Sequence, residues 1–333
     1  MSRLVITESA LDAVAKKFEL DKNALEVKTP SGGYSRNRLA IIKSNHRQIF
    51  VKEVDTTIVP GSGQEELGWL KKDYLCMKAI QAKYPEIVPD WIELIHDDKV
   101  LCMPAYSSES GWQWHLPNQP EEQAKYIELV VNAIDSLEKL KFDKSEIAKL
   151  NLAPVFKDDL ASNKGIELMA SDENYRKRLI SKYQKLLVSA QPHLQEPIKQ
   201  IITLLGDAKK IQELVKEGQK LAAQPNDYFG HCDIRTDNIA YNPKLAQIKL
   251  VDWNWASYTP KNFGATEFLV NAKLGGADIE PWTDKLNREM IASFIGLFTR
   301  SCLKDELVEG GSLRDYQANT AAIATYLHNK LSS

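Results

Sequence analysis

The sequence predicts an α+β fold of two lobes, with a small N-terminal antiparallel sheet that carries one long helix and a larger, mostly helical C-terminal lobe. Alternating or β-branched apolar runs are concentrated in residues 1–105, whereas helical periodicity dominates in residues 106–333. The only strong strand signal in the second half lies in Tyr228–Ser257. We therefore expect two domains with these boundaries and a ligand cleft between them.

The N-terminal lobe is expected to begin with an amphipathic helix over residues 7–18, capped by Thr7. The segments LEVKT, RLAIIK and QIFVKEV then predict three antiparallel strands. Helical periodicity returns over residues 64–83 and ends before a proline. The segments DWIELIHDD and KVLCMPAY predict a hairpin with its turn at Asp97-Asp98.

The C-terminal lobe is expected to be helical because apolar residues recur there at helical spacing between proline and glycine breaks. The predicted helices cover residues 120–142, 155–163, 173–190, 195–222, 284–303 and 313–331. Another helix is expected to start near Gly264.

The composition is that of an ordinary globular protein, with 333 residues, 43% hydrophobic and 26% charged. A net charge of −2 argues against nucleic acid as a partner, because phosphate neutralisation requires a basic face. The four cysteines lie far apart without a C-x-x-C pair, which is typical of a reducing cytoplasm. We expect a cytoplasmic protein with no membrane segment, and the sequence implies no protein partner.

The chemistry-bearing residues are concentrated in the hairpin after Tyr228. His231 to Asn238 reads H-x-D-x-x-x-x-N, and Asp252 follows at the end of an apolar strand. In phosphoryl transfer one Asp takes the proton of the acceptor hydroxyl, while an Asn and a later Asp hold magnesium. Asp and Asn also form turns, but a turn does not require the second Asp at a strand end. We therefore expect Asp233, Asn238 and Asp252 to form a phosphoryl-transfer site.

A second set of residues lies in the N-terminal lobe. Gly32 and Gly33 stand between two predicted strands, where glycine lets backbone N–H groups approach a phosphate, although a Gly-Gly pair alone usually marks a turn. Lys52 ends the strand QIFVK. A strand lysine is usually solvated, but this one follows the glycine-rich loop by one strand and is placed to reach nucleotide phosphates.

In this order, the motifs resemble the aminoglycoside phosphotransferase and choline kinase type of small-molecule kinases, which share a two-lobed protein-kinase-like fold. The resemblance covers nearly the whole chain. It implies Asp233 as catalytic base, Asn238 and Asp252 as Mg²⁺ ligands and ATP as co-substrate. It also implies a nucleotide site made by Gly32, Gly33 and Ser35 of SGGYSRN, by Lys52, and by Met103, Ala105 and Tyr106 of a hinge that pairs with adenine.

Lys52 is expected to have an acidic partner on the helix over residues 64–83. Glu66 has the family's usual residue type, whereas Asp73 better matches the usual distance to the following Ile87-Val88-Pro89. The two acids are seven residues apart and share one helix face, so both stay open.

Some positions depart from the family pattern or have two interpretations. Cys232 replaces the usual Gly or Arg after the motif histidine, and we expect it to be a packed small residue, with His231 packed beneath the loop. Arg235 either stabilises the transferred phosphoryl group or is an exposed arginine. Trp112 and Trp114 either line the cleft near the hinge or pack as anchors. A set of acidic residues either attracts a cationic acceptor or forms a solvated surface: Glu267, Asp278, Glu280 and Asp284.

The predicted function is phosphorylation of a hydroxyl group on a small molecule such as a sugar, an amino alcohol or an aminoglycoside. Asp252 is followed by Trp253-Asn254-Trp255 instead of Phe-Gly, and no Ala-Pro-Glu triplet follows, which disfavours a protein kinase. A nucleotide-binding regulator that has lost turnover is the alternative of another class, and the completeness of the motif residues counts against it.

Overall fold

A computed structural model describes residues 5–30, 37–45, 47–57, 63–152, 164–305 and 312–332. The chain forms two compact units. The first consists of Met1–His115, Phe142–Asn151 and Thr236–Ala256, and the second of Leu116–Lys141, Leu152–Arg235 and Ser257–Ser333. The units are therefore discontinuous in sequence, and the hairpin that carries Asn238 and Asp252 belongs to the first unit.

The first unit contains an antiparallel sheet of five strands in the order β1-β2-β3-β5-β4. Its strands are β1 (Glu26–Lys28), β2 (Arg38–Lys43), β3 (Gln48–Glu53), β4 (Glu93–Ile95) and β5 (Val100–Pro104). The turn between β4 and β5 places Asp97 and Asp98 in the left-handed region, with φ of 53° and 62°. The predicted N-terminal sheet and its last hairpin are confirmed.

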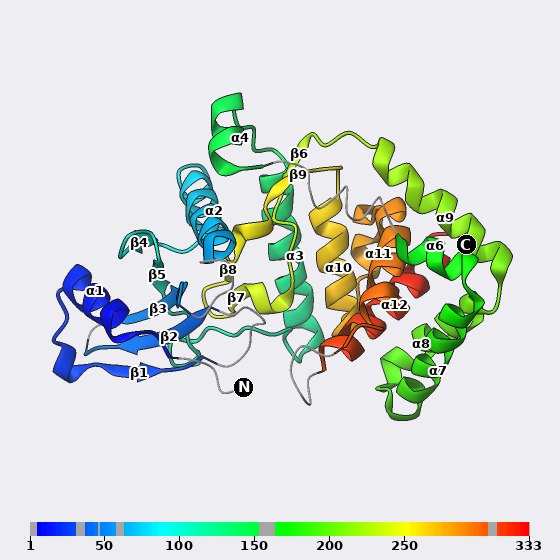
Figure 1. Cartoon of the computed structure of the whole chain (residues 1–333), viewed down its shortest axis with the longest axis horizontal. Helices are drawn as coiled ribbons and strands as arrows, with labels where there is room; N and C mark the ends of the chain where they lie inside the picture. Colours follow the sequence, from blue (N-terminus) through cyan, green and yellow to red (C-terminus); the bar gives the residue numbers. More distant parts are fainter. Residues whose placement is uncertain are drawn as a thin grey trace. The chain divides into compact units, whose positions relative to one another are not determined.

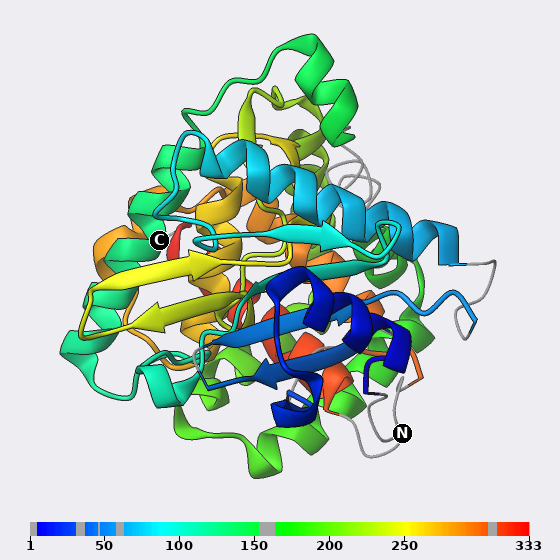
Figure 2. The ribbon, with the colours of Figure 1, turned by 90° about the vertical axis from the view of Figure 1, so that its left-hand side faces the viewer.

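Two helices accompany this sheet (Figures 1 and 2). Helix α1 (Glu8–Phe18) begins as predicted at Thr7, whose side chain accepts a hydrogen bond from the Ala10 N–H. Its apolar residues pack against one face of the sheet, in a core that includes Ile49 and Val51 of β3. Helix α2 (Gln64–Gln81) confirms the predicted long helix.

The rest of the first unit is short. It consists of α4 (Lys144–Leu150) and an antiparallel hairpin of β7 (Ile239–Asn242) and β8 (Gln247–Leu250). A 3-10 turn, η5 (Trp253–Trp255), follows Asp252.

The second unit is mostly helical, as predicted (Figure 1). Its helices are α3 (Pro120–Leu137), α6 (Lys164–Ser171), α7 (Glu173–Ser189), α8 (Pro192–Leu205), α9 (Ala208–Ala223), α10 (Phe263–Leu274), α11 (Arg288–Ser301) and α12 (Leu313–Lys330). Two short strands, β6 (Tyr228–Gly230) and β9 (Ser257–Thr259), pair antiparallel.

The prediction of one helix over residues 195–222 is wrong, because the chain breaks between α8 and α9. The Asp207 carboxylate accepts hydrogen bonds from the N–H groups of Lys209 and Lys210, both at 3.1 Å, and so caps a new helix. The predicted helix over residues 155–163 lies outside the described residues.

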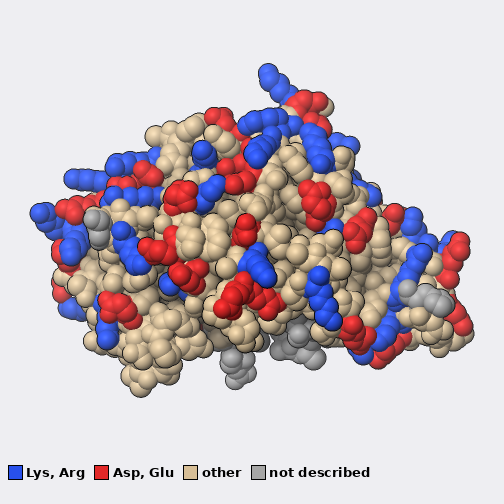
Figure 3. All heavy atoms as spheres, turned by 180° about the vertical axis from the view of Figure 1, so that it is seen from behind, with Lys and Arg blue, Asp and Glu red and all other residues tan. Residues whose placement is uncertain are grey.

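The face drawn in Figure 3 carries basic and acidic side chains interspersed, in keeping with a net charge of −2. Of the helices that the structure describes, none combines the length and the apolar character that crossing a membrane requires.

Candidate functional site

Lys52 is presented on the sheet face opposite α1. Side chains alternate along β3, so that Ile49 and Val51 face the core under α1 while Phe50 and Lys52 face the other way. The register pairs Lys52 with Leu39 of β2. Lys52 therefore projects from a face of the sheet on which its cross-strand neighbour, Leu39, is apolar.

The Lys52 ammonium forms ion pairs with two carboxylates although the residue is only 9% exposed. Its Nζ lies 2.8 Å from Oδ1 of Asp252 and 3.4 Å from Oδ2 of Asp73. Burial disfavours the ammonium, but the charges of Asp252 and Asp73 outweigh this and raise the pKa of Lys52. The lysine is thus a fixed positive charge.

Of the two acids left open by the sequence, Asp73 makes the ion pair. Within the described residues Lys52 forms no such pair with Glu66. Glu66 is in the first turn of α2, seven residues or about 10 Å of helix before Asp73. Glu66 is therefore the wrong choice as the partner of Lys52.

Asp73 also fixes the backbone after Asp252. Its Oδ1 accepts a hydrogen bond of 2.8 Å from the Trp253 N–H, and the residue is 1% exposed. Burial raises the pKa of Asp73 to about 6, while the ammonium of Lys52 opposes the rise. One buried carboxylate thus ties α2, β3 and η5 together.

The chain brings Asn238 next to the strand end that carries Asp252. Ile239 pairs with Leu250 in the β7–β8 ladder, and the Val251 N–H donates to the Asn238 carbonyl at 3.1 Å. Asp252 itself has a φ of 68°, in the left-handed region that is strained for a residue other than glycine. Such strain is common at functional sites.

The residues of this cluster fit a magnesium ion by the chemistry of their side chains. Asp252 offers a carboxylate and Asn238 a carboxamide oxygen, both hard ligands, and Mg²⁺ often takes only one or two ligands from the protein. Within the described chain no group of three or more His, Cys, Asp or Glu residues could hold a metal. The predicted Mg²⁺ ligation stays a prediction.

The predicted hinge runs from Met103 to Tyr106 and borders the same face of the sheet. Met103 pairs with Phe50, which in turn pairs with Ile41 of β2, so an apolar surface adjoins Lys52. The Ala105 N–H donates to the carbonyl of Gln48 at 3.0 Å. That N–H is therefore used within the sheet and is not offered to a nucleotide.

The predicted glycine-rich loop lies outside the described residues, and its members Gly32, Gly33 and Ser35 stay predictions.

The second unit contains Asp233 and Arg235, which form an ion pair with Nη1 of Arg235 3.1 Å from Oδ1 of Asp233. His231 is buried, and its Nδ1 accepts a hydrogen bond of 3.3 Å from the Asp233 N–H, which fits the expected packing beneath the loop. Cys232 is buried with a φ of 63°. A left-handed backbone explains why glycine suits this position.

Glu267 of α10 supports the loop that carries Asp233, a role beyond the two interpretations given to it from the sequence. It is half-buried, and its Oε2 accepts a hydrogen bond of 3.1 Å from the N–H of Ile234, the residue after Asp233. Burial, with the negative charge of Asp233, raises the pKa of Glu267 to about 8. The signal in the sequence was a single acid in the apolar segment FGATEFLV, which indicates a buried helix face.

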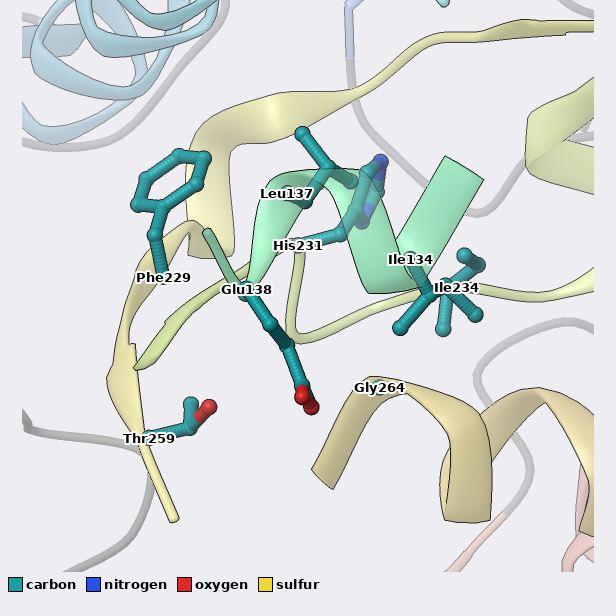
Figure 4. Close-up of a pocket in the computed structure, with 9 residues that line it drawn as sticks. Ile134, Leu137, Glu138, Phe229, His231, Ile234, Thr259 and Gly264 are labelled. Atoms are coloured by element: carbon teal, nitrogen blue, oxygen red, sulfur yellow. The ribbon is translucent and has the colours of Figure 1, made fainter. Parts of the chain in front are cut away.

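A small cavity lies beside this loop in the second unit (Figure 4). Glu138, His231, Ile234 and Thr259 are among the residues that line it. Its volume is about 10 Å³, which accommodates one water molecule at most. It is far too small for an acceptor substrate.

Known structures share this fold. The chain matches an ethanolamine kinase of Plasmodium vivax with a TM-score of 0.52 and 14% identity, over 91% of this chain and 82% of that one. It matches an aminoglycoside phosphotransferase solved with GDP and kanamycin with a TM-score of 0.52 and 11% identity, over 98% of this chain and 99% of that one. It matches a putative aminoglycoside phosphotransferase of Ralstonia eutropha with a TM-score of 0.50 and 12% identity, over 97% of this chain and 98% of that one.

No family model and no curated protein sequence matches the chain. At these identities the structural likeness establishes the fold, and the kinase-like fold expected from the sequence is confirmed.

Proposed function

We propose that this protein is a small-molecule kinase that transfers the γ-phosphoryl group of ATP to a hydroxyl group of its acceptor. The observation that supports it most is the cluster of Lys52, Asp73 and Asp252, because a buried cation held by two carboxylates is costly unless it serves a purpose. The fold of the ethanolamine and aminoglycoside kinases supports the same reaction class.

In the first unit, Lys52 would bind the phosphates of the nucleotide while Asp73 holds the ammonium in place. Asp252 and Asn238 would hold Mg²⁺, which neutralises charge on the β- and γ-phosphates when it is bound. Lys52 is paired with Asp252 in the structure, so nucleotide binding would exchange part of this ion pair for phosphate contacts. The permanent charge of Lys52 suits it to this exchange.

In the second unit, Asp233 would orient the acceptor hydroxyl and take its proton. Arg235 is close enough to Asp233 to hold it, and its guanidinium would stabilise the phosphoryl group during transfer. Glu267 would position the loop through the Ile234 N–H.

The acceptor is left open, because the named relatives act on or bind different small molecules. One is an ethanolamine kinase, and another was solved with kanamycin and GDP. The fold therefore selects neither the acceptor nor the nucleobase. We also propose a cytoplasmic location, since all four cysteines are buried and free.

The experiment measures Mg²⁺-dependent ATP turnover of wild type and Asp233→Asn against aminoglycosides, sugars and amino alcohols, with a protein mixture as control. We expect one class of small acceptor to raise turnover, and Asp233→Asn to lower it by about 10²–10⁴-fold without changing the affinity for the nucleotide. If ATP with Mg²⁺ raises the melting temperature but no acceptor raises turnover, the protein is a nucleotide-binding regulator. Turnover with the protein mixture alone would indicate a protein kinase.

A further inference from the structure

A second buried lysine in the first unit lies three residues before Asp252. Lys249 is on β8, and its side chain is 5% exposed. Its Nζ donates a hydrogen bond of 3.1 Å to the Pro85 carbonyl and forms an ion pair of 2.8 Å with Oδ1 of Asp90. A buried ammonium is costly unless it is paired and hydrogen-bonded. These two contacts therefore hold β8 against residues 85–90.

The next residue of β8 is attached to the same segment, and the segment is attached to α2. The Leu250 N–H donates to the Ile87 carbonyl at 2.7 Å. At the end of α2, the Gln81 side-chain amide donates to the carbonyls of residues 89 and 90 at 2.8 and 2.9 Å. Because α2 also carries Asp73, residues 85–90 join β8 to the helix that holds the Lys52 ammonium.

Asp252 is thus held to α2 on both sides along the chain. Lys249 and Leu250 attach the strand before it, and the Asp73 carboxylate accepts the N–H of Trp253 after it at 2.8 Å. The φ of 68° at Asp252 is a conformation that a residue other than glycine keeps only where its surroundings fix it. The two attachments supply such surroundings.

Asn238 depends on the same strand. The Val251 N–H donates to the Asn238 carbonyl at 3.1 Å, and Ile239 pairs with Leu250. A hairpin of two strands is at best marginally stable by itself, so β7 and β8 need contacts outside the hairpin to keep a fixed position. A shift of β8 would therefore move the carboxamide of Asn238 together with the carboxylate of Asp252.

The Lys249 ion pair also reaches the predicted hinge. Ala240 of β7 pairs with Lys249 and packs in a small core with Tyr106 and Trp112, whose ring centroids are 4.5 Å apart. The Tyr106 hydroxyl accepts a hydrogen bond of 3.2 Å from the Asp90 N–H. The pair of Lys249 and Asp90 is therefore part of a network that joins the hairpin to the hinge as well as to α2.

We propose that Lys249 and Asp90 are positioning residues that hold Asp252 and Asn238 in the arrangement that binds Mg²⁺ beside the nucleotide phosphates. They act through β8 and not by contact with the metal. Groups that orient the ligands of a metal in this way typically contribute about 10–100-fold to its affinity. The inference rests on the proposed function, since that function makes Asp252 and Asn238 the ligands of Mg²⁺.

The test measures ADP binding by titration calorimetry, once with Mg²⁺ and once with EDTA, for wild type, Lys249→Met, Asp90→Asn and Asp98→Asn. The informative quantity is the ratio of the two affinities, which reports how much Mg²⁺ strengthens binding. In Lys249→Met we expect this ratio to fall by about tenfold. The affinity in EDTA should change little, because Lys52 and Asp73 are unaltered.

Asp98→Asn is the matched control, because its carboxylate pairs with Lys71 on the surface of the same unit at 3.5 Å. We expect it to leave the ratio at the wild-type value. Asp90→Asn keeps an acceptor for the Lys249 ammonium but loses the charge, so the ratio should fall less than in Lys249→Met. The Asp90 side chain is 65% exposed, so this variant provides the test if Lys249→Met does not fold.

Hydrogen exchange without metal provides a second measurement. The amides of residues 247–252 should exchange faster in Lys249→Met and in Asp90→Asn than in wild type, and at the wild-type rate in Asp98→Asn. A wild-type ratio in Asp90→Asn or in folded Lys249→Met, or an equal loss of affinity with Mg²⁺ and with EDTA, overturns the inference while the proposed kinase function stands. If Mg²⁺ does not strengthen ADP binding to wild type, the proposed function itself fails.

Discussion

Replacing Lys52 with methionine removes a buried ammonium and leaves two carboxylates without it. The two respond differently, because the Asp252 side chain is 34% exposed and can be hydrated, whereas Asp73 is 1% exposed. We therefore expect Asp73 in the variant to retain a proton to higher pH. Its pKa, already about 6 in the presence of Lys52, should rise further without that charge.

The expected loss of stability depends on pH. Between about pH 4 and pH 6, Asp73 is protonated in folded wild type but ionised in the unfolded state, where its pKa has the ordinary value of 3.8. The free energy of unfolding therefore falls as pH rises from about 4 to about 6 and then levels off. In Lys52→Met the fall continues above pH 6 at up to about 1.4 kcal/mol per pH unit. Between pH 6 and pH 8 the variant should lose up to about 2.7 kcal/mol more than wild type, comparable with the cost of breaking a buried ion pair.

The assay is urea unfolding followed by tryptophan fluorescence at pH 6 and pH 8. Lys71→Met is the control, because Lys71 is 58% exposed and its ion pair with Asp98, at 3.5 Å, is on the surface. It should cost less than about 1 kcal/mol at either pH. An equal loss for Lys52→Met at both pH values would refute the reasoning, since the uncompensated charge of Asp73 would then not be its cause.

Three further outcomes are expected. Glu267→Gln keeps an acceptor for the Ile234 N–H but cannot ionise. In wild type the folded state keeps the Glu267 carboxyl group protonated up to about pH 8, so stability falls as pH rises. Calorimetry should therefore show a smaller fall in melting temperature between pH 5 and pH 8 for Glu267→Gln than for wild type. Gly165→Ala should lower the urea midpoint by the equivalent of about 3 kcal/mol, because its Cβ would lie 1.9 Å from the Gly296 carbonyl oxygen. Gly68→Ala, with no atom within 4 Å of its Cβ in a helix interior, should stabilise by about 0.5–1 kcal/mol, and a destabilisation would contradict this assignment.

Much of the fold could be predicted because it depends on local chemistry. Strand alternation in β2 and β3, the Thr7 cap of α1 and the turn at Asp97-Asp98 are short-range features of the chain. The break at Asp207 was missed because apolar spacing continues across it, although the residue is a good cap. At this position the helical spacing of the apolar residues favours one continuous helix, whereas the capping hydrogen bonds of Asp207 favour the start of a new one, and the structure has the new helix.

The sequence by itself determined which residue types stand at the ends of which strands, because periodicity and turn chemistry act over a few residues. It therefore identified Lys52, Asn238 and Asp252 as candidates. Only the tertiary structure decided that Asp73 is the partner of Lys52 and that Glu267 holds the loop of Asp233, because ion pairing and pKa depend on distance and burial between segments far apart in the chain.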